Sequence, residues 1–124
     1  MSQEIFPVLP PLTRGLPDMM EDLFITSISQ LLAANIGDET YVISNLCREM
    51  AISRTQLYRK FRLQTGTTPN QYFLSIRLQK ARELLGNPGV TVAEAAYKTG
   101  FKNISHFSQA FSRQFGTPPS EVRK

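Results

Sequence analysis

The stretch SRTQLYRKFRLQTGTTP, residues 53–69, returns fifty positions later as NISHFSQAFSRQFGTPP, residues 103–119. The pairs that match at this offset are Leu57 with Phe107, Phe61 with Phe111, Gln64 with Gln114, Gly66 with Gly116, Thr67 with Thr117 and Pro69 with Pro119. Upstream the offset is 49, so the second copy has gained one residue between Phe101 and Asn103. An insertion confined to a turn is what a duplicated helix–turn–helix tolerates, and two copies favour a duplicated module over a solenoid.

Each copy contains a helix whose first and last residues are marked by cap and stop signals. Ser53 is predicted to cap a helix over residues 54–65, and Gly66 is predicted to end it. Asn103 and Gly116 are predicted to begin and end the matching helix of the second copy. The equivalent placement of these signals predicts the same local fold in both copies.

A shorter helix is predicted to brace each of these two helices. The first bracing helix covers about 42–50, and the second runs from the T-x-x-E capping box at Thr91 through residue 98. Pro69, at a first helical position, predicts a linker helix over about 69–85 between the two modules. At 1.5 Å per residue this linker helix spans about 25 Å. The predicted boundaries are about 41–66 for the first helix–turn–helix and about 91–116 for the second.

The N-terminal part divides into a proline-rich segment and one further helix. Residues 1–17 lack amphipathic periodicity and are interpreted as a flexible arm or linker, followed by a folded domain over 18–124. Asp18 and Glu21 form a candidate capping box for a helix that ends before Gly37. Since no stretch has the pattern of a strand, the predicted class is all-α, with about seven helices.

The composition is that of a soluble globular domain, with 41% hydrophobic and 19% charged residues in 124. No run approaches the roughly 18 apolar residues of a membrane helix, and the first residues do not resemble a secretory signal. Because Cys47 and His106 are the only residues of their kinds, a disulfide framework and an ordinary Cys/His zinc site are excluded. We therefore expect no cofactor, no metal and no membrane contact, and a reducing, cytoplasmic compartment.

The charge is divided unevenly along the chain. Residues 1–40 carry one arginine against six carboxylates, a net charge of −5, whereas residues 41–124 carry thirteen cations against four carboxylates, a net charge of +9. A basic helical domain indicates a polyanionic partner, most simply nucleic acid. The alternative interpretation is a basic helical module that binds an acidic protein, or an ordinary solvated surface.

The two capped helices carry donors and cations on the faces opposite their core residues. A major groove accepts one helix, which then needs hydrogen-bonding groups for base edges and cations for phosphates. The first copy offers Arg54, Thr55, Tyr58, Arg59 and Arg62. The second copy offers Lys102, Asn103, Ile104, Ser105, Ser108, Gln109 and Arg113. Any one of these is more often a solvated residue, but two such faces at matching positions favour double-stranded DNA binding.

Four linked motifs resemble the AraC/XylS family of bacterial transcription activators. They are S-x-x-x-L-x-R-x-F-x-x-x-x-G from Ser53, R-L-x-x-A-x-x-L-L from Arg77, A-x-x-x-G-F from Ala96, and F-x-x-x-F-x-x-x-F-G-x-x-P from Phe107. The resemblance covers about residues 18–124. It implies two helix–turn–helix units joined by a long helix, with both recognition helices in successive major-groove segments.

The resemblance also implies roles for single residues and for other proteins. The base contacts of the family fall here on Thr55, Tyr58 and Arg59 in the first copy, and on Ile104, Ser105 and Gln109 in the second. Members of this family act with RNA polymerase and carry a ligand-sensing or dimerisation domain, or serve as output domains of two-component regulators. The chain is therefore expected to be the output domain of a longer regulator.

Four residues depart from the pattern of the family: Cys47, Ile104, Gln109 and Val122, the last standing where an aromatic residue is usual. Cys47 stands at a usual alanine in the bracing helix, where a small buried thiol should fit. Ile104 is apolar where polar contacts are common, and Gln109 replaces a frequent arginine. An enzyme is disfavoured because His106 is alone, and the carboxylates of the basic part lie on separate helices.

Overall fold

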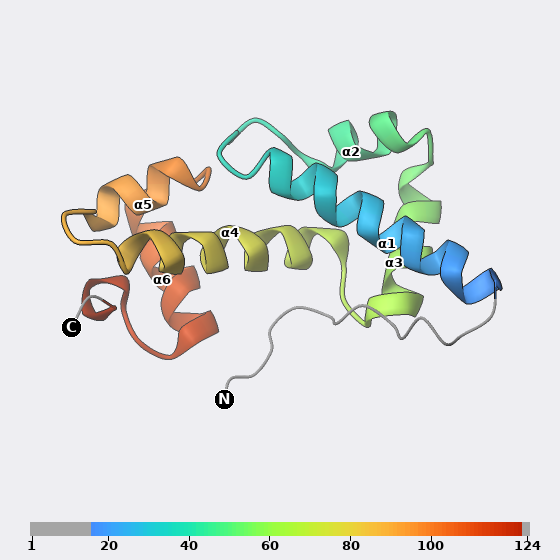
Figure 1. The fold of residues 1–124 in the computed structure, drawn as a ribbon. Helices are drawn as coiled ribbons and strands as arrows, with labels where there is room; N and C mark the ends of the chain where they lie inside the picture. The colour runs from blue at the N-terminus through green and yellow to red at the C-terminus, as the bar shows by residue number, and fades with distance from the viewer. Residues whose placement is uncertain (1–15, 123–124) are drawn as a thin grey trace. The chain divides into compact units, whose positions relative to one another are not determined.

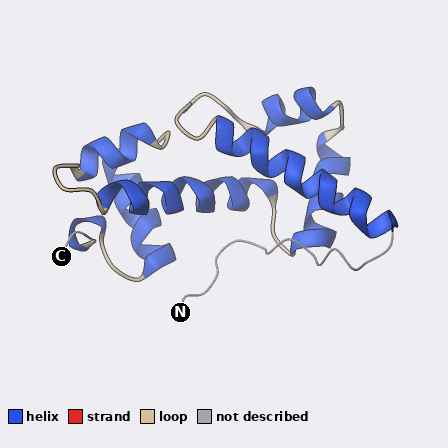
Figure 2. Ribbon diagram, in the orientation of Figure 1, coloured by secondary structure: helices blue, strands red, loops and turns tan. Residues whose placement is uncertain are grey.

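The computed structural model describes residues 16–122, and it describes their side chains from residue 23 onward. Every regular element in that range is helical, which confirms the all-α class (Figure 2). In chain order the elements are α1 (Leu16–Ala34), α2 (Ile43–Met50), α3 (Arg54–Thr65), α4 (Pro69–Leu85), α5 (Val92–Lys98), α6 (Ile104–Phe115) and the 3-10 turn η1 (Pro119–Glu121) (Figure 1).

The described residues form two compact units, with α4 beginning in the first and continuing in the second. The first unit contains residues 16–35 and 42–73, and the second contains residues 36–41 and 74–122. In the first, α1 contacts α2 and α2 contacts α3; in the second, α5 contacts α6 and α6 contacts η1. Each unit therefore has its own helix–turn–helix.

Each unit also has its own apolar core. The buried apolar residues of the first unit are Ile25, Ile28, Leu32, Ile43, Leu46, Leu57, Phe61, Tyr72 and Phe73. The core of the second unit consists of Leu78, Ala81, Leu85, Ala95, Ala96, Phe101, Phe107, Ala110 and Phe111. The repeat partners Leu57 and Phe107 are buried in their own units, as are Phe61 and Phe111, so the sequence repeat is a repeat of core positions.

The predicted caps of the two long repeat helices are confirmed. Ser53 Oγ accepts a hydrogen bond from the Gln56 N–H at 3.1 Å, and Asn103 Oδ1 accepts one from the His106 N–H at 2.9 Å. Gly66 and Gly116 end α3 and α6 with φ values of 79° and 81°, a left-handed conformation that glycine adopts without strain. Helices α3 and α6 thus begin and end at positions fifty residues apart.

The predicted N-cap of α1 was wrong. The helix begins at Leu16, so Asp18 lies within it and is not its N-cap. Pro17 explains the earlier start, because a proline in the first turn lacks only an N–H that needs no helical partner. The predicted arm otherwise lies in residues 1–15, outside the described range.

Helix α1 ends at Ala34, before Gly37 as expected. Gly37 itself does not have the positive φ of a left-handed helix stop. A Cβ at this position would lie 2.9 Å from the Lys98 carbonyl oxygen, so glycine is needed for close packing against the end of α5. Segment 36–41 is held to α4 by Arg77, which donates from Nε to the Ile36 oxygen at 3.1 Å and from NH2 to the Asp38 oxygen at 2.7 Å. Burial lowers the pKa of Arg77, and the nearby charge of Asp38 opposes that shift.

The turn of the first helix–turn–helix holds Ala51 at a φ of 55°, while Gly100 fills the equivalent turn of the second with a φ of 90°. A left-handed conformation costs a residue with a Cβ about 1–2 kcal/mol, a cost that glycine avoids. Glycine also has more conformational freedom in the unfolded chain, which offsets part of that gain in stability. We therefore expect Ala51→Gly to raise the free energy of unfolding by about 0.5–1 kcal/mol.

Urea denaturation of Ala51→Gly beside the unchanged protein measures this effect. The control is Ala33→Gly, a change of the same kind at an exposed alanine in the last turn of α1, where glycine should destabilise the chain. A loss of stability in Ala51→Gly equal to that of the control would show that the turn is not strained.

Candidate nucleic-acid interface

Helix α3 presents a cationic face to solvent. Its buried residues Leu57 and Phe61 are one turn apart, so the remaining faces point away from the core. Of the five predicted contact residues on α3, Arg54, Thr55, Arg59 and Arg62 are exposed and Tyr58 is half-buried. The helix carries four basic residues and no acidic one. Its exposed face therefore suits a polyanion.

Lys60, the one basic residue of α3 that was not among the predicted contacts, is turned toward α1. Its Nζ lies 4.5 Å from the centroid of the Phe24 ring, a cation–π contact between the two helices. Lys60 therefore packs against α1 within the first unit, which agrees with its absence from the predicted contact residues.

Tyr58 is held by two neighbours on the same face. Arg54 donates from NH2 to the Tyr58 hydroxyl at 3.3 Å, and the guanidinium carbon lies 5.1 Å from the ring centroid. Asn70, in the first turn of α4, donates from Nδ2 to the same hydroxyl at 2.7 Å. The sequence pattern missed Asn70, because a contact across twelve positions has no local signal.

Helix α6 presents a face of different chemistry. Phe107, Ala110 and Phe111 are buried. The predicted contact residues Lys102, Asn103, Ser105, Gln109 and Arg113 are exposed, Ile104 is exposed to 36%, and Ser108 is half-buried. Within the helix Arg113 is the one Lys or Arg, so this face offers mainly neutral hydrogen-bonding groups and an apolar side chain. The Asn103 oxygen already caps the helix, which leaves its amide nitrogen as the group for an external contact.

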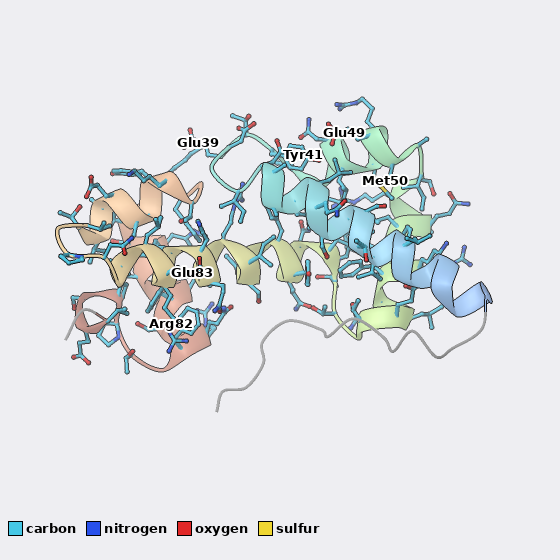
Figure 3. The ribbon with its side chains drawn as sticks, in the orientation of Figure 1. Glu39, Tyr41, Glu49, Met50, Arg82 and Glu83 are labelled. Carbon is cyan, nitrogen blue, oxygen red and sulfur yellow. The ribbon has the colours of Figure 1, made fainter. Side chains whose placement is uncertain are left out.

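An additional cation lies at the C-terminal end of α6. The guanidinium carbon of Arg82, on α4, lies 4.7 Å from the centroid of the Phe115 ring, and Figure 3 labels this exposed arginine beside Glu83. Phe115 is half-buried, because it covers the edge of the core beneath Arg82. Arg82 was not among the predicted contact residues.

Cys47 is a free cysteine and is half-buried, whereas its repeat partner Ala96 is fully buried. The expectation of a buried thiol therefore holds only in part, since the extra volume at this position reaches the surface of α2. We expect Cys47→Ala to leave DNA affinity within about threefold, because this small change nearly keeps the packed volume.

Binding titrations of wild type and Cys47→Ala, each with and without a thiol oxidant, test this expectation. Oxidant-sensitive binding that disappears with Cys47 would contradict a purely structural thiol.

None of the described residues form a group of three or more His, Cys, Asp or Glu side chains that could hold a metal ion. No described helix is long and apolar enough to cross a membrane.

A family model described as a helix-turn-helix domain matches residues 46–124. The chain is 37% identical over 79 residues to the HTH-type transcriptional activator RhaS of Escherichia coli, covering 64% of this chain and 28% of that protein. It is 30% identical over 101 residues to the Msm operon regulatory protein of Streptococcus mutans, covering 82% and 36%. The chain thus spans well under half of either relative.

Two solved structures share both the fold and part of the sequence. A transcriptional regulator with an AraC-type DNA-binding domain from Chromobacterium violaceum is 30% identical, with a TM-score of 0.78 over 85% of this chain and 93% of that one. The DNA-binding domain of AdpA, a global transcriptional factor solved in complex with a target DNA, is 26% identical, with a TM-score of 0.73 over 79% and 87%.

Proposed function

Because the chain belongs to the family of AraC-type helix-turn-helix DNA-binding domains, we propose that it binds double-stranded DNA of defined sequence and regulates transcription in bacteria. The observation that carries the proposal is the pair of exposed polar faces on α3 and α6. These helices share their boundaries, N-cap position and buried spacing at an offset of fifty residues. The related AdpA domain was solved on its target DNA, which supports the same class of ligand here.

In the proposed mode, α3 and α6 enter successive major-groove segments of one duplex. Arg59 is assigned to a guanine, whose O6 and N7 can accept two hydrogen bonds from one guanidinium. Thr55 and Tyr58 complete base reading by α3, and Arg54 and Arg62 neutralise phosphates. Helix α3 thus carries more positive charge than α6, whereas the proposed phosphate contacts are divided between the two units.

The second unit reads bases with less charge. Gln109 carries the amide that pairs with adenine N6 and N7, and Ile104 offers an apolar contact to a thymine methyl. Ser105 and Ser108 add hydroxyl groups, Asn103 adds its amide nitrogen, and Lys102 and Arg113 neutralise phosphates. We assign Arg82 to the phosphate side as well, because it is exposed next to the end of α6.

The remaining partners are inferred from the class of protein. The curated relatives are much longer than this chain, so we propose that it acts as the output domain of a longer regulator, with sensing in another domain. RNA polymerase is the proposed second partner, since a regulator of transcription acts on that enzyme. A DNA-binding regulator works where the bacterial chromosome lies, so we place the chain in the cytoplasm and assign it no catalytic activity.

The competing function is a basic module that binds an acidic protein. Selecting bound duplexes from a random library, then comparing a selected duplex with a scrambled one and with a polyglutamate peptide, separates the two. We expect the selected duplex to bind at least a thousandfold more tightly than the scrambled one, as specific sites commonly do. Equal binding of both duplexes and the peptide would overturn sequence-specific DNA binding.

A further inference from the structure

The hydroxyl of Tyr58 accepts two hydrogen bonds on the exposed face of α3. The donors are Asn70 Nδ2 at 2.7 Å and Arg54 NH2 at 3.3 Å. A phenolic oxygen can accept hydrogen bonds and donate one proton. With two donors already bound, this oxygen has little room to accept another hydrogen bond. The hydroxyl can still donate one hydrogen bond through its own O–H proton.

Within the described residues the Tyr58 hydroxyl accepts both of its hydrogen bonds and donates none. Tyr58 is half-buried, and the neighbouring positions of the same face, Arg54, Thr55 and Arg59, are exposed. The phenolic proton is therefore available to an acceptor outside the described residues, such as a DNA base.

We propose, on the basis of the DNA-binding function proposed above, that Tyr58 reads a base solely as a hydrogen-bond donor, and that Asn70 is the positioning residue that fixes this polarity. In the major groove the acceptors are guanine O6 and N7, adenine N7 and thymine O4, whereas cytosine N4 and adenine N6 are donors. Tyr58 therefore selects a base that offers an acceptor, such as guanine O6 or thymine O4, and disfavours cytosine, which offers only a donor at this edge.

The second copy lacks this arrangement. The repeat partners of Tyr58 and Asn70 are Ser108 and Ser120, and no hydrogen bond joins these two serines in the described chain. Donor-only reading through a tyrosine is thus a property of the first unit, and position 120 offers a matched control for changes at position 70.

The first test is Tyr58→Phe, which keeps the ring and removes only the hydroxyl. Competition binding uses the selected duplex and a set in which each base pair is replaced in turn. Tyr58→Phe should weaken the selected duplex about three- to tenfold, the value of one hydrogen bond, and abolish discrimination at one base pair only. Equal weakening of every duplex would mean a phosphate contact and would overturn the inference.

The second test reverses the polarity of the hydroxyl. In Asn70→Asp the carboxylate accepts the phenolic proton, so the Tyr58 oxygen can only accept from DNA. Preference at the same base pair should then move toward cytosine or adenine, whose amino groups donate. An acidic residue in the first turn of α4 suits the helix dipole, so the variant should fold, as its thermal unfolding will show.

Two controls isolate the polarity effect from the added charge. Ser120→Asp adds the same carboxylate at the equivalent position of the second copy and should leave preference at the Tyr58-dependent base pair unchanged. Tyr58→Phe combined with Asn70→Asp should show no preference there. If Asn70→Asp keeps the wild-type preference, Asn70 does not position Tyr58. If wild type selects no duplex at all, the proposed function fails first, so the two failures are distinguishable.

Discussion

Affinity for the selected duplex should fall roughly 500-fold between 50 and 200 mM monovalent salt. Each neutralised phosphate releases counterions and contributes about −0.9 to the slope of log affinity against log salt. Five exposed cations are assigned to phosphates, namely Arg54, Arg62, Arg82, Lys102 and Arg113. Five contacts predict a slope near −4.5, and a fourfold rise in salt then gives the expected loss.

Fluorescence anisotropy of a labelled duplex at several salt concentrations measures the slope. Lys80→Ala is a matched control, because this exposed lysine lies 3.6 Å from the Glu83 carboxylate and is not assigned to DNA. Its slope should equal that of wild type. A flat response of the wild-type protein over the same range would contradict phosphate-driven binding.

Arg59→Ala should weaken binding to the selected duplex by up to about 100-fold and relax preference at one base pair. The exposed Arg59 lies two residues beyond buried Leu57, which places it about 200° around α3 from the core. A bidentate contact to guanine gives about 1–3 kcal/mol of discrimination, all of which the truncation removes. The salt slope should change little, since the lost contact is to a base.

Arg113→Ala is the paired variant, with the opposite signature. Arg113 lies in the last turn of α6 and is assigned to a phosphate, so its loss should weaken all duplexes alike and reduce the salt slope by about one. Both side chains are exposed, so neither change should lower the unfolding temperature appreciably. The assignment is wrong if Arg59→Ala weakens cognate and scrambled duplexes equally, or if Arg113→Ala alters base preference.

The sequence predicted those features whose causes lie within a few residues. Ser53, Thr91 and Asn103 each cap a helix through the N–H three positions on, so the starts of α3, α5 and α6 are local properties. The left-handed glycines at the ends of α3 and α6 are local for the same reason. The exposed positions of α3 and α6 followed from these boundaries and the spacing of Leu57, Phe61, Phe107 and Phe111.

The features that sequence analysis missed depend on residues brought together from separate elements. Asn70 meets Tyr58, and Arg82 meets Phe115, across loops whose course no local pattern defines. The need for glycine at position 37 was missed for the same reason, because the carbonyl of Lys98 in α5 leaves no space there for a Cβ. The left-handed Ala51 was missed because alanine rarely signals such a turn, although its repeat partner Gly100 does.

Selection from a random duplex library with wild type, Arg59→Ala and Gln109→Ala tests most directly whether both units read one duplex. Arg59 lies on α3 and Gln109 on α6, so each variant changes one recognition helix. We expect wild type to select two blocks of sequence about one helical turn apart, roughly ten base pairs. Arg59→Ala should relax one block and Gln109→Ala the other. A single block, or one block relaxed by both variants, would contradict reading by two recognition helices.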